Sequence, residues 1–404
     1  MFAVLCVVGV GAWLEFGHPR GPGVDRARSG GRSRPAPNAT SYASGSGVLG
    51  GQSLSSITPI GAKVLWAWTQ NQSALTGGGQ DIEFTTNGGR TWNNATPTGL
   101  SVEGGAHWIN GFFALSSTRA WLVYGRVDKN PQYLETTSDA GRHWSKVGVL
   151  PRHYCTLQFV TPLDGTCTVY AGAAGSMGIT IYRTSDGGAH WSNLFDSYMT
   201  PASLNEPTPP GGLPFSCDKS ISFTSATTGW ALFLCAGGFS PIYESTNGGA
   251  TWVQRNALPP SPLPSGGSGF SGTPVFSGAH GAVAYTYGSY SLVYVSDNAG
   301  RTFRPVYPPG KRRPWSVALL SPREWRLAYK DSILGTDNAG QSWFVVTSDA
   351  NQVVPPERYA SPAPDVLFAK TSLAWLIENN VLLRTVNEGQ SWKTIAVPGT
   401  QEAK

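Results

Sequence analysis

The sequence predicts an all-β protein built from repeated units, and three observations support this prediction. An eight-residue segment recurs seven times along the 404 residues, at intervals of about 50 residues. The chain contains 50 glycines and 30 prolines and only 13% charged residues, as expected for many short strands joined by turns. No helical hydrophobic periodicity of useful length occurs between residues 52 and 398.

The recurring segment reads Ser/Thr-x-Asp/Asn-x-Gly-x-polar-aromatic. Its copies occupy 85–92, 137–144, 184–191, 245–252, 296–303, 336–343 and 385–392. The third position is filled by Asn87, Asp139, Asp186, Asn247, Asn298, Asn338 and Asn387. An Asp or Asn side chain caps backbone N–H groups two residues on, and glycine adopts the positive φ that tight turns require. We therefore expect each copy to be a structural β-hairpin turn that buries its aromatic ring, rather than a catalytic motif.

Short strand-like runs surround every copy of this segment. One run precedes it, as at 81–84, and another begins at its aromatic residue. A further pair of runs lies upstream, as at 221–223 and 229–233. Each unit thus holds about four short strands, and four-stranded units repeated around an axis form a β-propeller. The sequence predicts an all-β, seven-bladed β-propeller of four-stranded antiparallel blades over residues 52–398.

The recurring segment resembles the Asp-box, or BNR repeat, of sialidases, sortilin-type receptors and some glucanases. The fuller unit pairs an apolar-x-Phe run with Gly-Trp-Ala and then Ile-Tyr-x-Ser/Thr-x-Asp/Asn-Gly-Gly, as at 221–252. This pattern is most similar to the photosystem II assembly/stability factor type of repeat protein. The resemblance covers about 350 of the 404 residues and implies the fold more strongly than a function, because such propellers include enzymes, receptors and assembly factors.

The chain ends differ in composition from the repeats. Residues 1–16 contain a short apolar run that resembles a signal peptide or an anchor, although no Lys or Arg precedes it. Residues 17–51 are rich in Gly, Pro, Ser and Arg and predict a disordered linker, and 399–404 form a short tail. The net charge of +5 and the lack of a basic stripe argue against a nucleic-acid partner.

Four of the five cysteines fall into two pairs. Cys155 and Cys167 flank the first hairpin turn of the third unit, and Cys217 and Cys235 flank the equivalent turn of the fourth. Each pair is placed nearly opposite across two inner strands, where a disulfide fits. Disulfides would place the protein outside the cytoplasm, secreted or held in the cell envelope, whereas four buried free thiols are the alternative.

Most of the 15 tryptophans have a structural interpretation. Six of them occupy the aromatic position of the recurring segment. Another six fall on the second strand of their units and are expected to pack between blades: Trp66, Trp68, Trp121, Trp230, Trp325 and Trp375. No cluster of His, Cys, Asp or Glu has metal-ligand spacing, so we expect neither a metal nor a cofactor.

The recurring turns should all lie on one face of the disc, so the connections between blades open on the opposite face. The family resemblance implies that this opposite face binds ligands. The most distinctive connection carries three adjacent cations beside an aromatic residue, and two other connections carry an Arg with an aromatic neighbour. The binding candidates are therefore Lys311, Arg312, Arg313, Trp315, Arg152, His153, Tyr154, Arg358 and Tyr359. An acidic peptide or phosphate-like group suits these side chains, and solvated surface charges are the alternative.

The enzyme interpretation is weaker but stays open. A sialidase requires an arginine cluster that includes an Arg-Ile-Pro stretch near the first blade, and the chain has no Arg-Ile-Pro. A glycosidase requires two carboxyl groups around the scissile bond. The opposite face offers scattered acids with no spacing that nominates a pair: Asp128, Asp196, Glu206, Asp349, Glu357 and Glu378.

Together these features predict a non-catalytic extracytoplasmic scaffold. We expect a monomer, with a possible N-terminal membrane tether, that binds a protein or polymer through the face opposite the recurring turns. The alternative is a carbohydrate-active protein, either a glycoside hydrolase or a glycan-binding propeller, that uses the same face.

Overall fold

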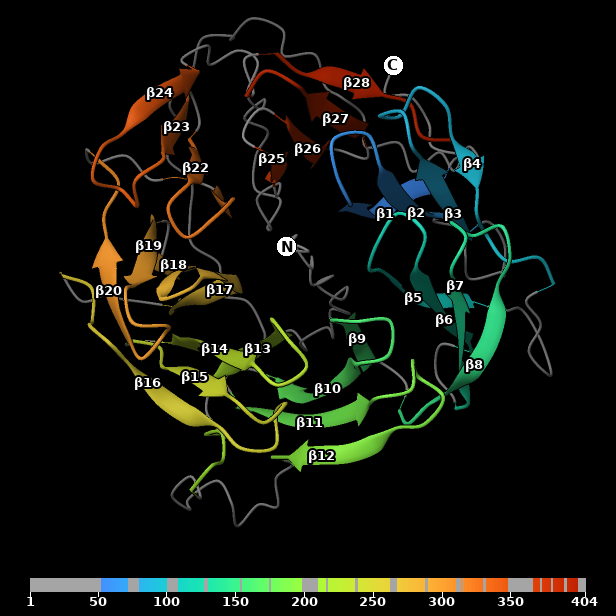
Figure 1. Ribbon diagram of the computed structural model, residues 1–404, viewed down its shortest axis with the longest axis horizontal. Helices are drawn as coiled ribbons and strands as arrows, with labels where there is room; N and C mark the ends of the chain where they lie inside the picture. Colours follow the sequence, from blue (N-terminus) through green and yellow to red (C-terminus); the bar gives the residue numbers. More distant parts are fainter. Residues whose placement is uncertain are drawn as a thin grey trace, which may run out of the picture.

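The computed structural model is built from antiparallel β-sheets arranged in a ring (Figure 1). It describes residues 52–71, 80–99, 108–126, 130–152, 155–173, 176–197, 210–215, 217–236, 239–261, 267–287, 290–309, 314, 316–329, 332–347, 366–370, 373–378, 381–388 and 391–398. All of the secondary-structure elements in these ranges are strands. None of the described segments forms a helix of the length and apolar character needed to cross a membrane.

Five of the sheets have four strands, and each is formed by strands consecutive in the sequence. The first two sheets contain β1 (Gln52–Pro59), β2 (Leu65–Asn71), β3 (Gln80–Thr85), β4 (Asn93–Asn94), β5 (Trp108–Ala114), β6 (Ala120–Gly125), β7 (Gln132–Thr137) and β8 (Ser145–Leu150). The third contains β9 (Cys155–Phe159), β10 (Gly165–Ala173), β11 (Ser176–Thr184) and β12 (Ser192–Asp196). The last two contain β21 (Ser316–Leu319), β22 (Trp325–Ala328), β23 (Ile333–Thr336), β24 (Phe344–Thr347), β25 (Val366–Lys370), β26 (Leu373–Glu378), β27 (Val381–Thr385) and β28 (Lys393–Ile395).

The remaining eight strands form one sheet by joining two four-stranded segments. They are β13 (Asp218–Phe223), β14 (Gly229–Ala236), β15 (Ile242–Ser245), β16 (Val253–Ala257), β17 (Gly267–Ser277), β18 (His280–Tyr287), β19 (Tyr290–Ser296) and β20 (Thr302–Val306). The outer strands β16 and β20 pair in parallel, and the inner strands β14 and β17 pair antiparallel. The backbone groups at the end of β16 and the start of β17 thus bond to strands of the neighbouring four-stranded segment.

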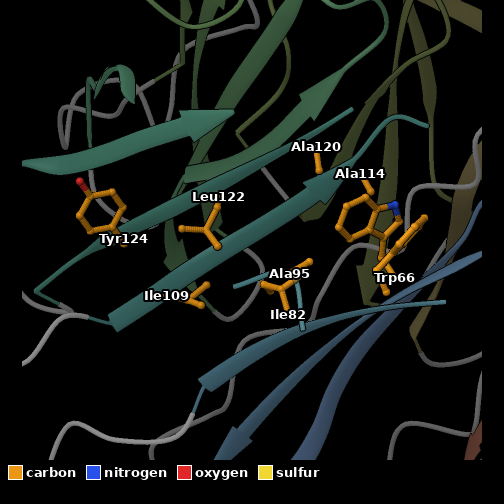
Figure 2. Close-up of a cluster of buried hydrophobic side chains, with 9 residues drawn as sticks. Trp66, Ile82, Ala95, Ile109, Ala114, Ala120, Leu122 and Tyr124 are labelled. Atoms are coloured by element: carbon orange, nitrogen blue, oxygen red, sulfur yellow. The ribbon is translucent and has the colours of Figure 1, made fainter. Parts of the chain in front are cut away.

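Apolar clusters join each four-strand segment to the next around the ring. Figure 2 shows one such cluster, in which Trp66, Ile82 and Ala95 from the first sheet meet Ile109, Ala114, Ala120, Leu122 and Tyr124 from the second. Seven clusters of this kind occur in the described residues. Each contains the aromatic residue of the later segment's recurring turn, such as Trp144 here. These aromatic rings therefore lie between sheets, and not simply under their own turns.

One tryptophan that was predicted to pack between blades, Trp325, contacts a different neighbouring sheet from the others. Trp66, Trp121, Trp230 and Trp375 directly follow the residue that pairs with the first Ser or Thr of the recurring turn. In the β21–β24 sheet that position is held by Arg326, which is 1% exposed, and Trp325 lies one residue earlier. Because successive strand residues point to opposite faces, Trp325 packs against the preceding sheet instead of the following one.

The first and last sheets close the ring through side chains and not through a shared strand. Leu65 and Ala67 of β2 pack with Trp375, Leu382 and Ile395 of the last sheet. At one end of this junction, the Arg384 side chain reaches across, and its Nη2 donates a hydrogen bond of 2.9 Å to the carbonyl of Ala62. Burial of these apolar side chains supplies the main stabilisation of the junction.

Candidate functional site

The recurring segments, called box turns below, bond mainly to themselves. In the first of them, Thr85 Oγ1 accepts from the backbone N–H groups of Asn87 and Gly89 and donates to Asn87 Oδ1. Asn87 Oδ1 also accepts from Thr91 N at 3.0 Å, while Asn87 Nδ2 donates to Thr91 Oγ1 at 2.7 Å. These polar atoms hold the turn, which leaves them poorly placed to bind a substrate.

The glycine at the fifth position of the box turn serves two purposes. Gly89 has a φ of +82°, in the left-handed region that L side chains rarely adopt. A Cβ added to Gly89 would also collide with Ile395 Cγ2 of the preceding sheet in the ring. Glycine is therefore needed both for the turn and for the close approach of two sheets.

Two box turns use an aspartate and a histidine in place of an amide and a hydroxyl. His143 Nδ1 lies 2.6 Å from Asp139 Oδ2, and His190 Nδ1 lies 2.7 Å from Asp186 Oδ2. Hydrogen bonds from the backbone and ring of His143 lower the pKa of Asp139 to about 2. Similar bonds from His190 and Thr184 lower the pKa of Asp186. Both aspartates are thus held as turn-stabilising carboxylates and not as proton donors.

Arg152 lies in the connection from β8 to β9, on the face opposite the box turns. Its exposed side chain folds over the β9–β12 sheet, where Nε donates to Tyr182 Oη at 3.3 Å. This hydrogen bond and the negative charge of Asp196 raise the pKa of Arg152. The guanidinium is therefore positioned beside an aromatic ring on this face and keeps further N–H donors for a ligand.

The other predicted binding residues lie outside the described residues, so their predicted roles stay predictions. They are His153, Tyr154, Lys311, Arg312, Arg313, Trp315, Arg358 and Tyr359. Tyr307 precedes Lys311 in the same connection. Its side chain is exposed, and its hydroxyl accepts a hydrogen bond of 2.7 Å from Ser261 N. Tyr307 thereby ties two neighbouring connections of the opposite face together.

Both predicted disulfides are present. Cys155 and Cys167 are bonded with an S–S distance of 2.05 Å, and Cys217 and Cys235 with one of 2.11 Å. The strand register places Cys155 diagonally across from Cys167, because Cys155 pairs with Val169. Each bond ties one inner strand, or the connection leading into it, to the neighbouring strand.

Lys219 is a buried cation that spacing arguments missed. It lies at the end of β13 nearest the opposite face, and its Nζ donates to the carbonyls of Met177 at 2.8 Å, Cys217 at 3.0 Å and Phe215 at 3.1 Å. Burial lowers its pKa to about 8. The ammonium group joins the connection before β13 to the preceding sheet. The sequence signal for this buried cation was a lysine at an inward-facing position of β13, an inner strand.

Asp81 and Glu83 form a carboxylate pair that was also missed. Asn94 Nδ2 donates to both, at 3.0 Å to Asp81 and 3.3 Å to Glu83. Burial, then repulsion from Asp81, raises the pKa of Glu83 to about 7. Their i, i+2 spacing on β3 was the signal, because it places both side chains on one face of the strand. Glu83 pairs with Ala67 on the face that packs against the last sheet, so this pair lies between sheets.

The acids predicted for a glycosidase site cannot be assembled into a pair from the described side chains. Asp196 is exposed on the opposite face. The side chains of Asp128, Glu206, Asp349, Glu357 and Glu378 lie outside the described residues. In the described part of the chain, no group of three His, Cys, Asp or Glu residues has metal-binding geometry.

A small hollow of about 10 Å³, room for about one water molecule, lies on the box-turn side, between the β9–β12 sheet and the start of the eight-stranded sheet. Arg183 and Asp164 line it and form an ion pair at 3.4 Å. Gln158 also lines it and bonds through its carboxamide to both the N–H and the carbonyl of Phe223, each at 2.9 Å. The volume is below that of ordinary ligand pockets, and its polar groups already join the two sheets.

Comparison with known proteins identifies the fold. The sequence matches no protein-family model, and no curated protein matches it. The structure of YCF48 bound to a D1 peptide is similar, with a TM-score of 0.50 and 18% identity over 83% of this chain and 92% of that chain. YCF48 from Cyanidioschyzon merolae has a TM-score of 0.49 and 16% identity over 83% and 95%.

A prolyl endopeptidase has a TM-score of 0.53 and 10% identity over 85% of this chain, which spans 50% of that enzyme. At such identities, structural likeness establishes a shared fold and carries no activity from one protein to another. The chain is an all-β propeller whose solved neighbours include YCF48.

Proposed function

We propose that this chain is a non-catalytic, extracytoplasmic, seven-bladed propeller that binds a protein partner through the face opposite the box turns. Five sheets count as one blade each, and the eight-stranded sheet counts as two, β13–β16 and β17–β20. A monomer tethered or secreted through its first 51 residues completes the proposal.

The hydrogen bonding of the box turns carries this proposal. Their Ser, Thr, Asn and Asp side chains are bonded within the turns, as in the first and last of the seven. The recurring residues therefore build the scaffold. Binding is left to the connections of the other face, where loops on a rigid framework commonly carry function.

The disulfides support the extracytoplasmic part of the proposal. Both pairs brace inner strands of the third and fourth blades, and disulfides persist mainly in oxidising compartments. An oxidising cell envelope or the extracellular space suits such a protein.

Two observations favour a protein partner over a glycan substrate. Asp81 and Glu83 share a hydrogen-bond donor, but Glu83 is only 4% exposed and lies between two sheets, where no glycosidic bond can reach it. In addition, a propeller of similar fold, YCF48, has been solved with a bound peptide.

Capture of the partner from an envelope extract of the source organism tests this proposal. The test variant is Lys311→Ala with Arg312→Ala and Arg313→Ala, and the matched control removes three box-face charges, Arg301→Ala with Arg304→Ala and Arg323→Ala. We expect the test variant to recover at least about tenfold less of the wild-type partner, and the control to recover it normally.

Equal recovery of the partner by the wild type and both variants would show that Lys311, Arg312 and Arg313 are not part of the binding site. Release of reducing sugar from envelope polysaccharides by the purified wild type would instead show that the protein is a glycoside hydrolase, the alternative function.

A further inference from the structure

The box face carries cations on several sheets, and one set of them in the described residues forms no ion pairs. Six of them lie on three consecutive sheets, β25–β28, β1–β4 and β5–β8, which adjoin one another in the ring (Figure 1). This set, the basic arc, consists of Lys63, Arg90, Arg119, Arg142, Arg384 and Lys393. Every member lies in a box turn, in the turn before the second strand of its sheet, or at the adjoining strand end.

Contacts bring the first members of the arc together. The Lys63 carbonyl accepts from Gly88 N at 2.8 Å, which fixes the turn carrying Lys63 beside the box turn carrying Arg90. Arg384 lies against the same box turn, since a Cβ on Gly88 would meet Arg384 Nη1 at 2.7 Å. Lys393 pairs with Arg384 across β27 and β28. Four cations are thus grouped where the first and last sheets meet.

The β5–β8 sheet extends the arc. Its tight turn carries Arg119, and Ala140 N donates to the Thr118 carbonyl at 3.0 Å, which joins that turn to the box turn of Arg142. Trp144 Nε1 donates to the Ala95 carbonyl at 2.8 Å, which fixes this box turn against the first sheet. The arc is therefore continuous across both junctions.

These cations are not neutralised by acids in the described part of the chain. None of the six forms an ion pair there. On the other described sheets Arg183, Arg255, Arg304 and Arg326 form ion pairs, while Arg301 and Arg323 form none. Burial and the nearby charge of Arg90 lower the pKa of Arg384, so the like charges repel one another. The described acids of these three box turns are Asp139, which is bonded to His143, and Glu388, which forms no ion pair.

The surroundings of the arc indicate the kind of ligand. The aromatic rings beside the arc, Trp121 near Arg119 and Trp375 near Arg384, are buried between sheets and offer no platform on which nucleic-acid bases stack. Val386 is the one large apolar side chain exposed in the described residues of these box turns, so a folded protein partner finds no anchoring pocket. A ligand held by many charges along an extended chain fits best.

We infer that the basic arc binds an anionic polysaccharide, with its carboxylate or sulfate groups spaced along the cations of the three sheets. This site lies on the face opposite the one proposed for the protein partner. A propeller placed outside the cytoplasm meets such polymers, and arginine forms bidentate hydrogen bonds with oxyanions.

Binding of polygalacturonate and heparin to the purified full chain tests this inference. The test variant combines Lys63→Ala, Arg90→Ala and Arg142→Ala, which are exposed side chains whose loss leaves the sheet junctions intact. The matched control is Arg301→Ala with Arg304→Ala and Arg323→Ala, which removes three charges elsewhere on the box face. Affinity is measured at several salt concentrations around physiological ionic strength, because charge-driven binding weakens as salt rises.

We expect the test variant to bind at least one of the two polysaccharides about tenfold more weakly than wild type and with a smaller salt dependence, and the control to lose less than about threefold. Equal losses in both variants, or no binding by the wild type, would overturn the site. Tighter binding of a DNA duplex than of either polysaccharide would overturn the ligand class. None of these outcomes depends on the protein partner.

Discussion

At the scale of single residues, the buried titratable groups show how strongly position changes chemistry. Glu83 and Lys219 are 4% and 6% exposed, and burial favours the neutral form of each. Lys219 has three carbonyl partners, which satisfy all three ammonium donors. Glu83 has a second carboxylate beside it and an amide donor that the two share. Glu83 is therefore the residue whose ionisation opposes the fold near neutral pH.

The pH dependence of stability should report this cost. The pKa of Glu83 rises from 4.5 to about 7 on folding, so the folded state binds more protons than the unfolded state between these values. The contribution of Glu83 to the free energy of unfolding is fully present below about pH 4.5 and declines as the pH rises through about 7. We expect Glu83→Gln to remove the decline and to raise the unfolding temperature at pH 8 by about 2 °C or more.

The matched variant is Glu135→Gln, because Glu135 also lies two residues before the first Thr of a box turn. Burial raises the pKa of Glu135, but a hydrogen bond from Tyr124 and the charge of Lys146 oppose that rise. We therefore expect Glu135→Gln to reduce the decline of stability with pH less than Glu83→Gln does. Thermal unfolding followed from pH 4 to pH 8 makes the comparison, and a Glu83→Gln profile that still falls with pH would contradict this explanation.

At the scale of elements, the arginine before the first Thr of a box turn links neighbouring sheets at two junctions. Arg183 lies against Gly248 of the next sheet, and Arg384 lies against Gly88 of the first sheet. The two junctions differ in one respect. Consecutive chain joins the sheets around Arg183, whereas Arg384 spans the junction between the first and last sheets, where the chain provides no direct link.

We therefore expect Arg384→Ala to destabilise the protein more than Arg183→Ala. Arg384 contributes a hydrogen bond to the Ala62 carbonyl and lies 5.2 Å from the centre of the Trp375 ring, so its loss should cost about 2 kcal/mol. Hydrogen exchange should also accelerate in β1–β4 and β25–β28 together. Equal destabilisation by Arg183→Ala, with no faster exchange in the first and last sheets, would show that this arginine does not secure the closure.

The elements also show which features a sequence can predict. The box turns and their flanking strands were predictable because glycine, Asp or Asn and hydrophobic alternation act locally. The sheet against which Trp325 packs was not predictable, since a one-residue shift in register reverses the direction of every side chain on a strand. The pairing of β16 with β20 was missed for another reason: both strands look like ordinary outer strands, and only the ring brings them together.

At the scale of the whole molecule, the box face is built from scaffold residues, and the proposed binding residues belong to the opposite face. The apolar clusters and box aromatics hold consecutive sheets together, and the polar side chains of the box turns form hydrogen bonds within the turns. The disulfides and Arg152 could be located from the sequence because they belong to strands or to their immediate ends. Most of the remaining binding candidates belong to longer connections, whose conformation depends on distant neighbours and not on local spacing.

We propose that a protein partner binds the face opposite the box turns. Site-specific photo-crosslinking tests this proposal, with a photoreactive residue placed at Arg152 in one protein and at Arg142 on the box face in another. Both proteins are exposed to the same envelope extract. A single protein crosslinked from position 152 and absent from position 142 is the predicted result, whereas the same protein crosslinked only from position 142 would contradict the claim.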